Sequence, residues 1–209
     1  MDFYRKTKPA EHFLMTSQPR KVYDLEHEEL NCMIWVREKN KAITQYLECF
    51  DRNEFCDSVV ITNGLEEKML EDFFKNFPKD HDDLRKGHEL LKNDIMAILK
   101  MITPLNPKRY LEISLNPFLK DETWHYSESE INIICSYTNI GMEWVENNFT
   151  NWHDGSPQVR DDSSVKMLGT NHVAIFKGID YPGSLSPFVY RLKDSAKFLL
   201  KINSYLAEH

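Results

Sequence analysis

The feature that most constrains the fold is a change of hydrophobic period between Pro104 and Pro107. Before this point, apolar residues recur at three- and four-residue steps over 81–102, which predicts one long amphipathic helix. After it, apolar and polar residues alternate, beginning with 109–115, which predicts strands. Helices followed by many short strands are typical of an α+β protein, in which the helices pack against a sheet.

The same patterns predict the other elements. Further helices are expected over 41–50 and 65–76, the first capped by Asn40. Strands are expected over 31–36, 58–62, 109–115, 130–138, 142–145, 165–169, 172–177, 187–191 and 196–203. The polar segment 147–164 predicts a long loop, because it is rich in Asp, Asn, Ser, Gly and Pro.

The domain organisation follows from these elements. Residues 1–30 are polar and interrupted by prolines, which predicts an irregular N-terminal arm. The range 31–209 is expected to form one α+β domain, since its length suits a single core. Within it, 31–105 is predicted to be a mainly helical lobe. We expect 106–209 to form the sheet part and 109–203 to hold nearly all the regular sheet.

Composition excludes several classes of function. The chain has 33 acidic and 26 basic residues, a net charge of -7, and no basic run, so nucleic acid and anionic membranes are not expected partners. No apolar run approaches the ~18 residues of a membrane-spanning helix, and the first residues lack the apolar core of a secretion signal. The four cysteines form no C-x-x-C pair, so a cytoplasmic protein without a zinc ribbon is predicted.

The stretch 124–145 (WHYSESEINIICSYTNIGMEWV) places polar residues beside a strand pattern. His125 stands just before the strand, and every second residue from Ile131 to Tyr137 falls on one face of it. A turn and the pair Glu143-Trp144 follow. A histidine at a strand entrance, near a turn, makes this stretch the strongest candidate for a chemical site in the chain.

This stretch resembles the signature of a bacterial family, the domain of unknown function 1826. The matching positions are Trp124-His125, Cys135-Ser136-Tyr137, Gly141, Glu143 and Trp144, with weaker matches at Ile34-Trp35, 173–178 and 181–183. The resemblance covers roughly 31–203. It implies helices packed on a distorted double-stranded β-helix, a cupin-like or jelly-roll-like architecture that non-haem iron oxygenases also use.

The resemblance also implies a metal-ligand pattern from which this chain departs. The family's His-x-Asp followed by a distant His resembles the facial triad of non-haem iron oxygenases. Here His125 is kept, but Ser127 stands in the place of the aspartate and Tyr190 in the place of the second histidine. His125 is therefore the one expected metal ligand. A relocated ligand set would have to draw on Glu128, Glu130, His153 and His172.

Two hypotheses for function remain open at this point, and with them whether the chain is an enzyme. In the first, it binds a small molecule or a protein partner on an oxygenase-like scaffold with an incomplete triad and no cofactor. In the second, it is an active oxygenase that uses Fe(II) and 2-oxoglutarate with altered ligands. The predicted pocket residues are His125, Ser127, Tyr137, Trp144, Tyr190, Arg191 and Lys197. Arg191, Lys197 and Lys201 lie where such oxygenases commonly carry the basic residue that binds the 2-oxoglutarate carboxylate.

Overall fold

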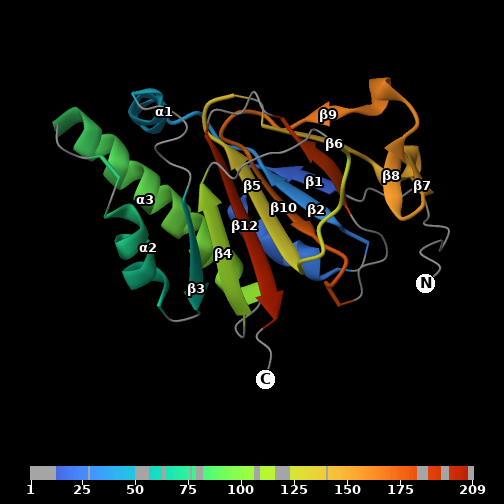
Figure 1. The fold of residues 1–209 in the computed structure, drawn as a ribbon, viewed down its shortest axis with the longest axis horizontal. Coiled ribbons are helices and arrows are strands. Elements are labelled where there is room, and N and C mark those ends of the chain that lie inside the picture. The colour runs from blue at the N-terminus through green and yellow to red at the C-terminus, as the bar shows by residue number, and fades with distance from the viewer. Residues whose placement is uncertain are drawn as a thin grey trace.

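The structure is a computed structural model that describes residues 13–27, 29–49, 57–62, 65–75, 77–78, 82–105, 109–115, 123–139, 141–182, 188–193 and 198–206. Its elements form three layers (Figure 1). Helices cover one face of a seven-stranded sheet, and a three-stranded sheet packs on the other face. The protein is therefore of the α+β class.

The helical layer is as the sequence predicts. It contains α1 (Lys41–Glu48), α2 (Glu66–Phe74) and α3 (Asp82–Ile102), with a short 3-10 helix at Thr103–Leu105. The Oδ1 atom of Asn40 accepts hydrogen bonds from the backbone N–H groups of Ala42 and Ile43, which caps α1. No helix among the described residues is both long and apolar enough to cross a membrane.

The large sheet draws strands from the whole chain. Its order is β1 (Phe13–Thr16), β2 (Cys32–Trp35), β10 (Val173–Lys177), β5 (Ile131–Ser136), β12 (Leu199–Leu206), β4 (Arg109–Leu115) and β3 (Asp57–Thr62). All neighbours are antiparallel except β1 and β2. The expectation that 109–203 holds nearly all the regular sheet is therefore wrong, because β1, β2 and β3 are recruited from the first part of the chain.

The expected irregular arm is also wrong where the structure describes it. Residues 13–16 form β1, and a 3-10 helix spans Pro19–Glu26. Val22 and Leu25 of this helix are buried in the core that α3 and the large sheet share. Their three-residue spacing places both on one side of a 3-10 helix, which is why so short an apolar pattern is enough to anchor the segment. Residues 1–12 lie outside the described part of the chain.

The small sheet consists of β11 (Val189–Leu192), β6 (Met142–Val145) and β9 (Lys166–Met167). A second apolar cluster fills the space between the two sheets, and Trp144, Phe176 and Leu199 contribute to it from β6, β10 and β12. From β5 onward the chain passes between the large and small sheets in the order β5, β6, β9, β10, β11, β12. The two layers are thus built from interleaved parts of the chain.

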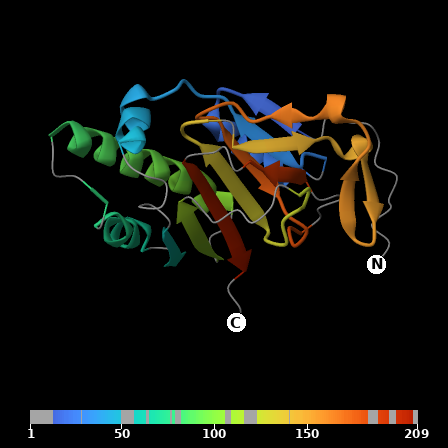
Figure 2. The ribbon, with the colours of Figure 1, turned by 45° about the horizontal axis from the view of Figure 1, so that its top comes forward.

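The segment 147–164 is more regular than the predicted loop. It forms a hairpin of β7 (Thr150–His153) and β8 (Ser156–Val159), flanked by 3-10 helices at Asn147–Phe149 and Asp162–Ser164. The hairpin projects from one end of the molecule (Figure 2). Its two-residue turn has positive φ at Asp154 (48°) and Gly155 (78°), a conformation that Asp-Gly sequences favour. The Asp-Gly pair was the missed signal for a hairpin.

Candidate binding site

His125 and Tyr190 face each other, as predicted from their places in the resemblance. Their backbones form an isolated antiparallel bridge, with N–H to carbonyl distances of 2.9 and 3.0 Å. The two rings pack edge to face with their centroids 4.5 Å apart. This bridge joins the segment before β5 to β11, although the residues are far apart in sequence.

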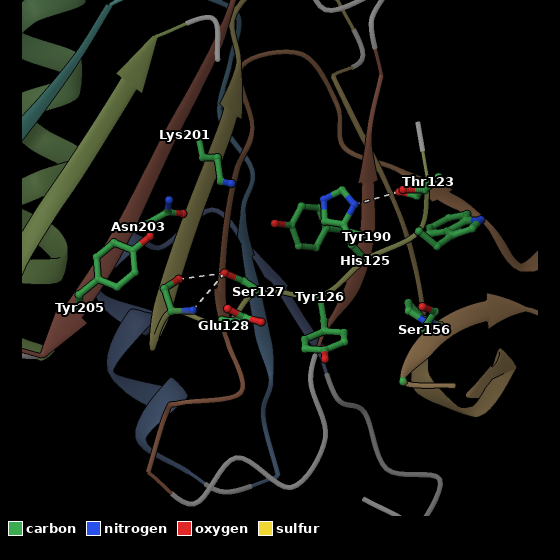
Figure 3. Close-up of a pocket in the computed structure, with 14 residues that line it drawn as sticks. Thr123, His125, Tyr126, Ser127, Glu128, Ser156, Tyr190, Lys201, Asn203 and Tyr205 are labelled. Atoms are coloured by element: carbon green, nitrogen blue, oxygen red, sulfur yellow. Dashed lines mark hydrogen bonds between the residues drawn. The ribbon is translucent and has the colours of Figure 1, made fainter. Parts of the chain in front are cut away.

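A cavity of about 580 Å³ opens beside this pair (Figure 3). Its walls come from the segment 123–129, from the tip of the β7–β8 hairpin and from the strands β11 and β12. The lining residues are Thr123, Trp124, His125, Tyr126, Ser127, Glu128, Ser129, Gly155, Ser156, Pro157, Tyr190, Lys201, Asn203 and Tyr205. Most carry a polar group, and the volume is that of a small-molecule pocket.

The Tyr190 side chain is 1% exposed and packs between Phe176 and Phe188 in the cluster between the sheets. Burial raises the pKa of its phenol well above the ordinary value, because the low-dielectric surroundings disfavour the phenolate. Tyr205 adds a smaller effect in the same direction. Tyr190 therefore presents a protonated hydroxyl to the cavity at neutral pH.

The His125 ring is oriented by the backbone. Its Nδ1 atom lies 2.9 Å from the carbonyl oxygen of Thr123 (Figure 3). Because a carbonyl only accepts hydrogen bonds, Nδ1 carries the proton in this contact. In the neutral ring Nε2 then holds the lone pair.

Ser127 belongs to a small hydroxyl network at the bottom of the cavity. Its Oγ atom donates to Oδ1 of Asn132 at 2.6 Å, and the Ser129 hydroxyl donates to the same oxygen at 2.7 Å. The two hydroxyl oxygens are 2.9 Å apart. Asn132 is fully buried on β5, so this network fixes the position of the segment 127–129 relative to the large sheet.

Gly178 supports the same segment from β10. Its N–H donates to the carbonyl of Glu130 at 2.8 Å, and the next N–H, of Ile179, donates to the carbonyl of Ser127 at 2.9 Å. A Cβ atom at Gly178 would lie 1.7 Å from the Ser129 carbonyl oxygen, which is an impossible contact. The Lys-Gly pair of the family signature is thus explained by a close backbone approach that positions the cavity wall.

Lys201 is the lysine of the cavity lining. The other lining residue that can carry a positive charge is His125. Within the described parts of the chain, no hydrogen bond or ion pair involves its Nζ atom. Burial lowers the pKa of the amine, and the nearby Glu112 carboxylate partly opposes that shift. Glu112 also accepts weak hydrogen bonds from Asn203 at 3.3 Å and from Tyr205 at 3.4 Å.

Several predicted pocket residues lie elsewhere. Tyr137 is on the helix-facing side of the large sheet, where its hydroxyl donates to Asp94 at 2.8 Å. Trp144 is buried between the sheets. Arg191 points away from the cavity, because it follows Tyr190 on β11 and strand neighbours alternate in direction. It pairs with Glu143 at 2.6 Å and stacks on Trp124. These three residues are not among those that line this cavity, and Lys197 lies outside the described residues.

The alternative ligand set is also dispersed. Glu128 lines the cavity, but His153 is exposed on the hairpin. The Nδ1 atom of His172 faces the backbone N–H of Arg37 at 3.4 Å. Among the described residues, no three His, Cys, Asp or Glu side chains are grouped so that they could hold a metal ion. The relocated set is therefore not assembled in this part of the structure.

The cavity includes residues that the sequence did not single out. Tyr126 and Ser156 have no distinguishing pattern, because the hairpin tip meets the segment 123–129 only in the folded molecule. Asn203 and Tyr205 had a usable signal. They follow Lys201 at two-residue steps, so the three side chains share one face of β12.

Comparisons with known proteins place the chain in a family. The comparison with curated proteins found no match. Among solved structures, a dioxygenase for auxin oxidation in rice is 11% identical, with 90% of this chain and 76% of that chain covered and a TM-score of 0.48. C-terminally truncated Neurospora crassa T7H in the apo form is 10% identical, with 94% of each chain covered and a TM-score of 0.43.

Full-length Neurospora crassa T7H in complex with alpha-KG is 9% identical, with 93% of this chain and 84% of that chain covered and a TM-score of 0.42. The comparison with family profiles, in contrast, gives a match that rests on the sequence itself. The profile of one family matches residues 16–191, which is most of the chain. The chain therefore belongs to the family described as protein of unknown function (DUF1826).

Proposed function

We propose that this protein binds a small anionic molecule in the cavity between His125 and Lys201, on a double-stranded β-helix with an incomplete metal-binding triad. The observation that carries the proposal is the cavity itself, in which an amine without a partner among the described residues lies among hydroxyl groups. Its volume of about 580 Å³ favours a small molecule over a protein segment as the occupant.

The alternation of strands supports the double-stranded β-helix. From β5 to β12 the chain crosses repeatedly between the large and small sheets, which is how this architecture is wound. His125 precedes β5 and Tyr190 lies on β11, and the bridge between them closes one end of the two-layer core. The cavity lies beside this bridge, since His125 and Tyr190 both line it.

The donor groups support an incomplete triad. An Fe(II) triad of this type needs two imidazoles and a carboxylate. Ser127 offers a neutral hydroxyl that donates to Asn132, and Tyr190 offers a phenol whose raised pKa disfavours the phenolate that a metal would need. The residues at these three positions do not fit Fe(II), so no step through iron is derived.

Lys201 supports an anion as the ligand. A charge-assisted hydrogen bond from an ammonium group to a carboxylate is worth ~1.5–3 kcal/mol. The hydroxyls of Tyr190, Ser156 and Tyr205 offer further donors around the same space. A carboxylate-bearing molecule of the size of 2-oxoglutarate satisfies these groups without requiring a metal.

Isothermal titration calorimetry tests the binding. Wild type is titrated with 2-oxoglutarate, succinate, citrate and inorganic phosphate, beside Lys201→Met and the control Lys100→Met, whose lysine is exposed on α3. Saturable binding of at least one anion is expected, weakened ~10–100-fold by Lys201→Met and unchanged by Lys100→Met. Binding that is equal in all three proteins, or no binding to wild type, would contradict the proposal.

A second experiment tests the inherited triad. Ser127→Asp restores a carboxylate two residues after His125, and Tyr190→His restores the second imidazole. The double variant should bind Co(II) more tightly than the two single effects combined, since neighbouring ligands are not additive. Anaerobic Co(II) titration at neutral pH measures this. If a folded double variant binds no better than either single variant, the scaffold does not hold triad geometry.

A further inference from the structure

We propose that Lys201 captures a carbonyl compound, an aldehyde or a 2-oxo acid, as a covalent imine. This inference rests on the proposed function, because it concerns the same cavity and adds the reactive group of the ligand. Four observations bear on it: the placement of the amine, its surroundings, its protonation and the proton donors that face it.

The placement of the amine is fixed by the sheet. Lys201 lies on β12 between β4 and β5, directly opposite Ser114 on one side and Ile134 on the other. Its side chain leaves the sheet on the face away from the helices and ends at the cavity. Figure 3 shows the Lys201 amine and the Tyr190 hydroxyl pointing into the same space, from β12 and β11 respectively. A bound ligand would therefore meet the amine directly.

The surroundings leave this amine available. By contrast, the amine of the buried Lys177 donates a hydrogen bond to the carbonyl of His27 at 2.8 Å. Lys166 pairs with Glu146. The Nζ atom of Lys201 makes no hydrogen bond or ion pair with any described residue. A lysine held in place without a counter-ion is better suited to react than to stabilise the fold.

Burial of Lys201 makes its amine easier to deprotonate than that of an exposed lysine. Burial lowers its pKa below the ordinary lysine value, which increases the fraction of free amine at neutral pH. The ionisable groups that line the cavity with it are His125, Tyr126, Glu128, Tyr190 and Tyr205. The Glu112 carboxylate on β4 also acts on its pKa. Glu112 opposes the shift, but burial is the larger cause.

The reaction balances without any oxidant or reductant. The nitrogen lone pair of Lys201 forms a bond to the carbonyl carbon, and the carbonyl π electrons move to oxygen, which takes up a proton to give a carbinolamine. The hydroxyl group then leaves as water after protonation, and the nitrogen lone pair closes the C=N bond. The net change is one amine plus one carbonyl giving one imine and one water. The proton that the oxygen gains is the one that the nitrogen loses, and the Tyr190 hydroxyl, which points into the same space, would donate a hydrogen bond to that oxygen.

The lining sets the class of carbonyl compound. Hydroxyls from Ser127, Ser156 and Tyr205 line the same cavity as the amine, so polar substituents next to the carbonyl are favoured over long apolar chains. Small 2-oxo acids and hydroxylated aldehydes meet this requirement, and the cavity of about 580 Å³ has room for them. In the imine the carboxylate would be held by the lining hydroxyls instead of by Lys201, which would direct the neighbouring carbonyl carbon to Nζ.

Reductive trapping tests the inference. The intact protein is incubated separately with glyoxylate, pyruvate, 2-oxoglutarate and glyceraldehyde in the presence of sodium cyanoborohydride, which converts an imine to a stable secondary amine. Intact-mass measurement counts the adducts and peptide mapping locates them. With at least one compound, a single early adduct is expected on Lys201, formed at least ~10-fold faster than on the exposed Lys100.

Variants and pH make the result decisive. Lys201→Arg should abolish the early adduct, whereas Lys100→Arg should leave it unchanged. The advantage of Lys201 over Lys100 should shrink toward pH 10, because both amines are then largely deprotonated. Adducts spread evenly over the lysines, or none with any of the four compounds, would overturn the inference. If calorimetry still shows anion binding that needs Lys201, the imine alone is wrong; if both fail, the proposed function fails with it.

Discussion

The two faces of the large sheet are built from the same strands, yet they differ in what covers them. The helix-facing side is sealed by α1, α2, α3 and the 3-10 helix of residues 19–26, and its core is continuous. The opposite side is covered by the small sheet only over part of its width (Figure 1). On β12 this difference falls on alternate residues: Leu200 and Ile202 enter the sealed core, whereas Lys201 and Asn203 reach the cavity.

The sealed face contains a group of buried polar side chains that bond to one another. The Arg37 guanidinium bonds the Asp94 carboxylate at 2.6 Å and the Asn171 carbonyl at 2.7 Å, and Tyr137 donates to the second Asp94 oxygen. Cys135 lies beside Arg37, and burial raises the pKa of its thiol to about 12. The cavity face instead keeps an amine and several hydroxyls directed at solvent-accessible space. Polar groups therefore serve cohesion on one face and recognition on the other.

Of the variants that test this contrast, Asp94→Ala should cause the largest loss of stability. It leaves the nearly buried Arg37 without its counter-ion and Tyr137 without its acceptor, and breaking such a buried pair costs about 3–5 kcal/mol of unfolding free energy. Urea denaturation at pH 7 measures the loss. The matched control is Glu71→Ala, which removes the more exposed partner of Lys92 and should change stability by at most ~1 kcal/mol. Equal effects would show that the sealed face does not depend on its ion pair.

Gly178→Ala tests how the cavity wall is positioned. The new Cβ would collide with the Ser129 carbonyl, so the segment 127–129 must move, at a cost of ~1–3 kcal/mol. Chemical shifts of Ser127 and Ser129 should change more than those of the α3 core. Gly155→Ala is the control. The added Cβ would meet no atom within 4 Å, so the only strain comes from placing an alanine at a φ of +78°. A Gly178→Ala protein with wild-type stability and shifts would contradict the close approach.

Lys201→Met should have the smallest effect on stability. The folded-state pKa of Lys201 is lowered, so below that pKa the folded protein carries a disfavoured charge, and wild-type stability rises as pH approaches the ordinary lysine value. At pH 7 the variant should be as stable as wild type or up to ~1 kcal/mol more stable. This difference should shrink between pH 8 and pH 10 in parallel urea titrations. A clear loss of stability at pH 7 would mean that Lys201 supports the fold.

The parts that could be predicted from sequence are local or inherited. The helix over 82–102 follows from its apolar period. The alternation along β12 predicts that the side chains of Leu200 and Lys201 point to opposite faces of the sheet. The facing of His125 and Tyr190 follows from the family signature. Arg191 and Tyr137 lie away from this cavity because a strand neighbour points to the opposite face, and the signature alone does not say which face borders the cavity.

The sequence by itself determined most of the helices and strands and which of their residues share a face, because both depend on interactions between near neighbours in the chain. Only the tertiary structure decided that β1, β2 and β3 join strands from the second part of the chain, and that the small sheet leaves part of the large sheet uncovered. The cavity exists at that uncovered edge. Its walls come from 123–129, 155–157, Tyr190 and β12. Contacts between such distant segments depend on how whole layers pack, and no local pattern encodes that.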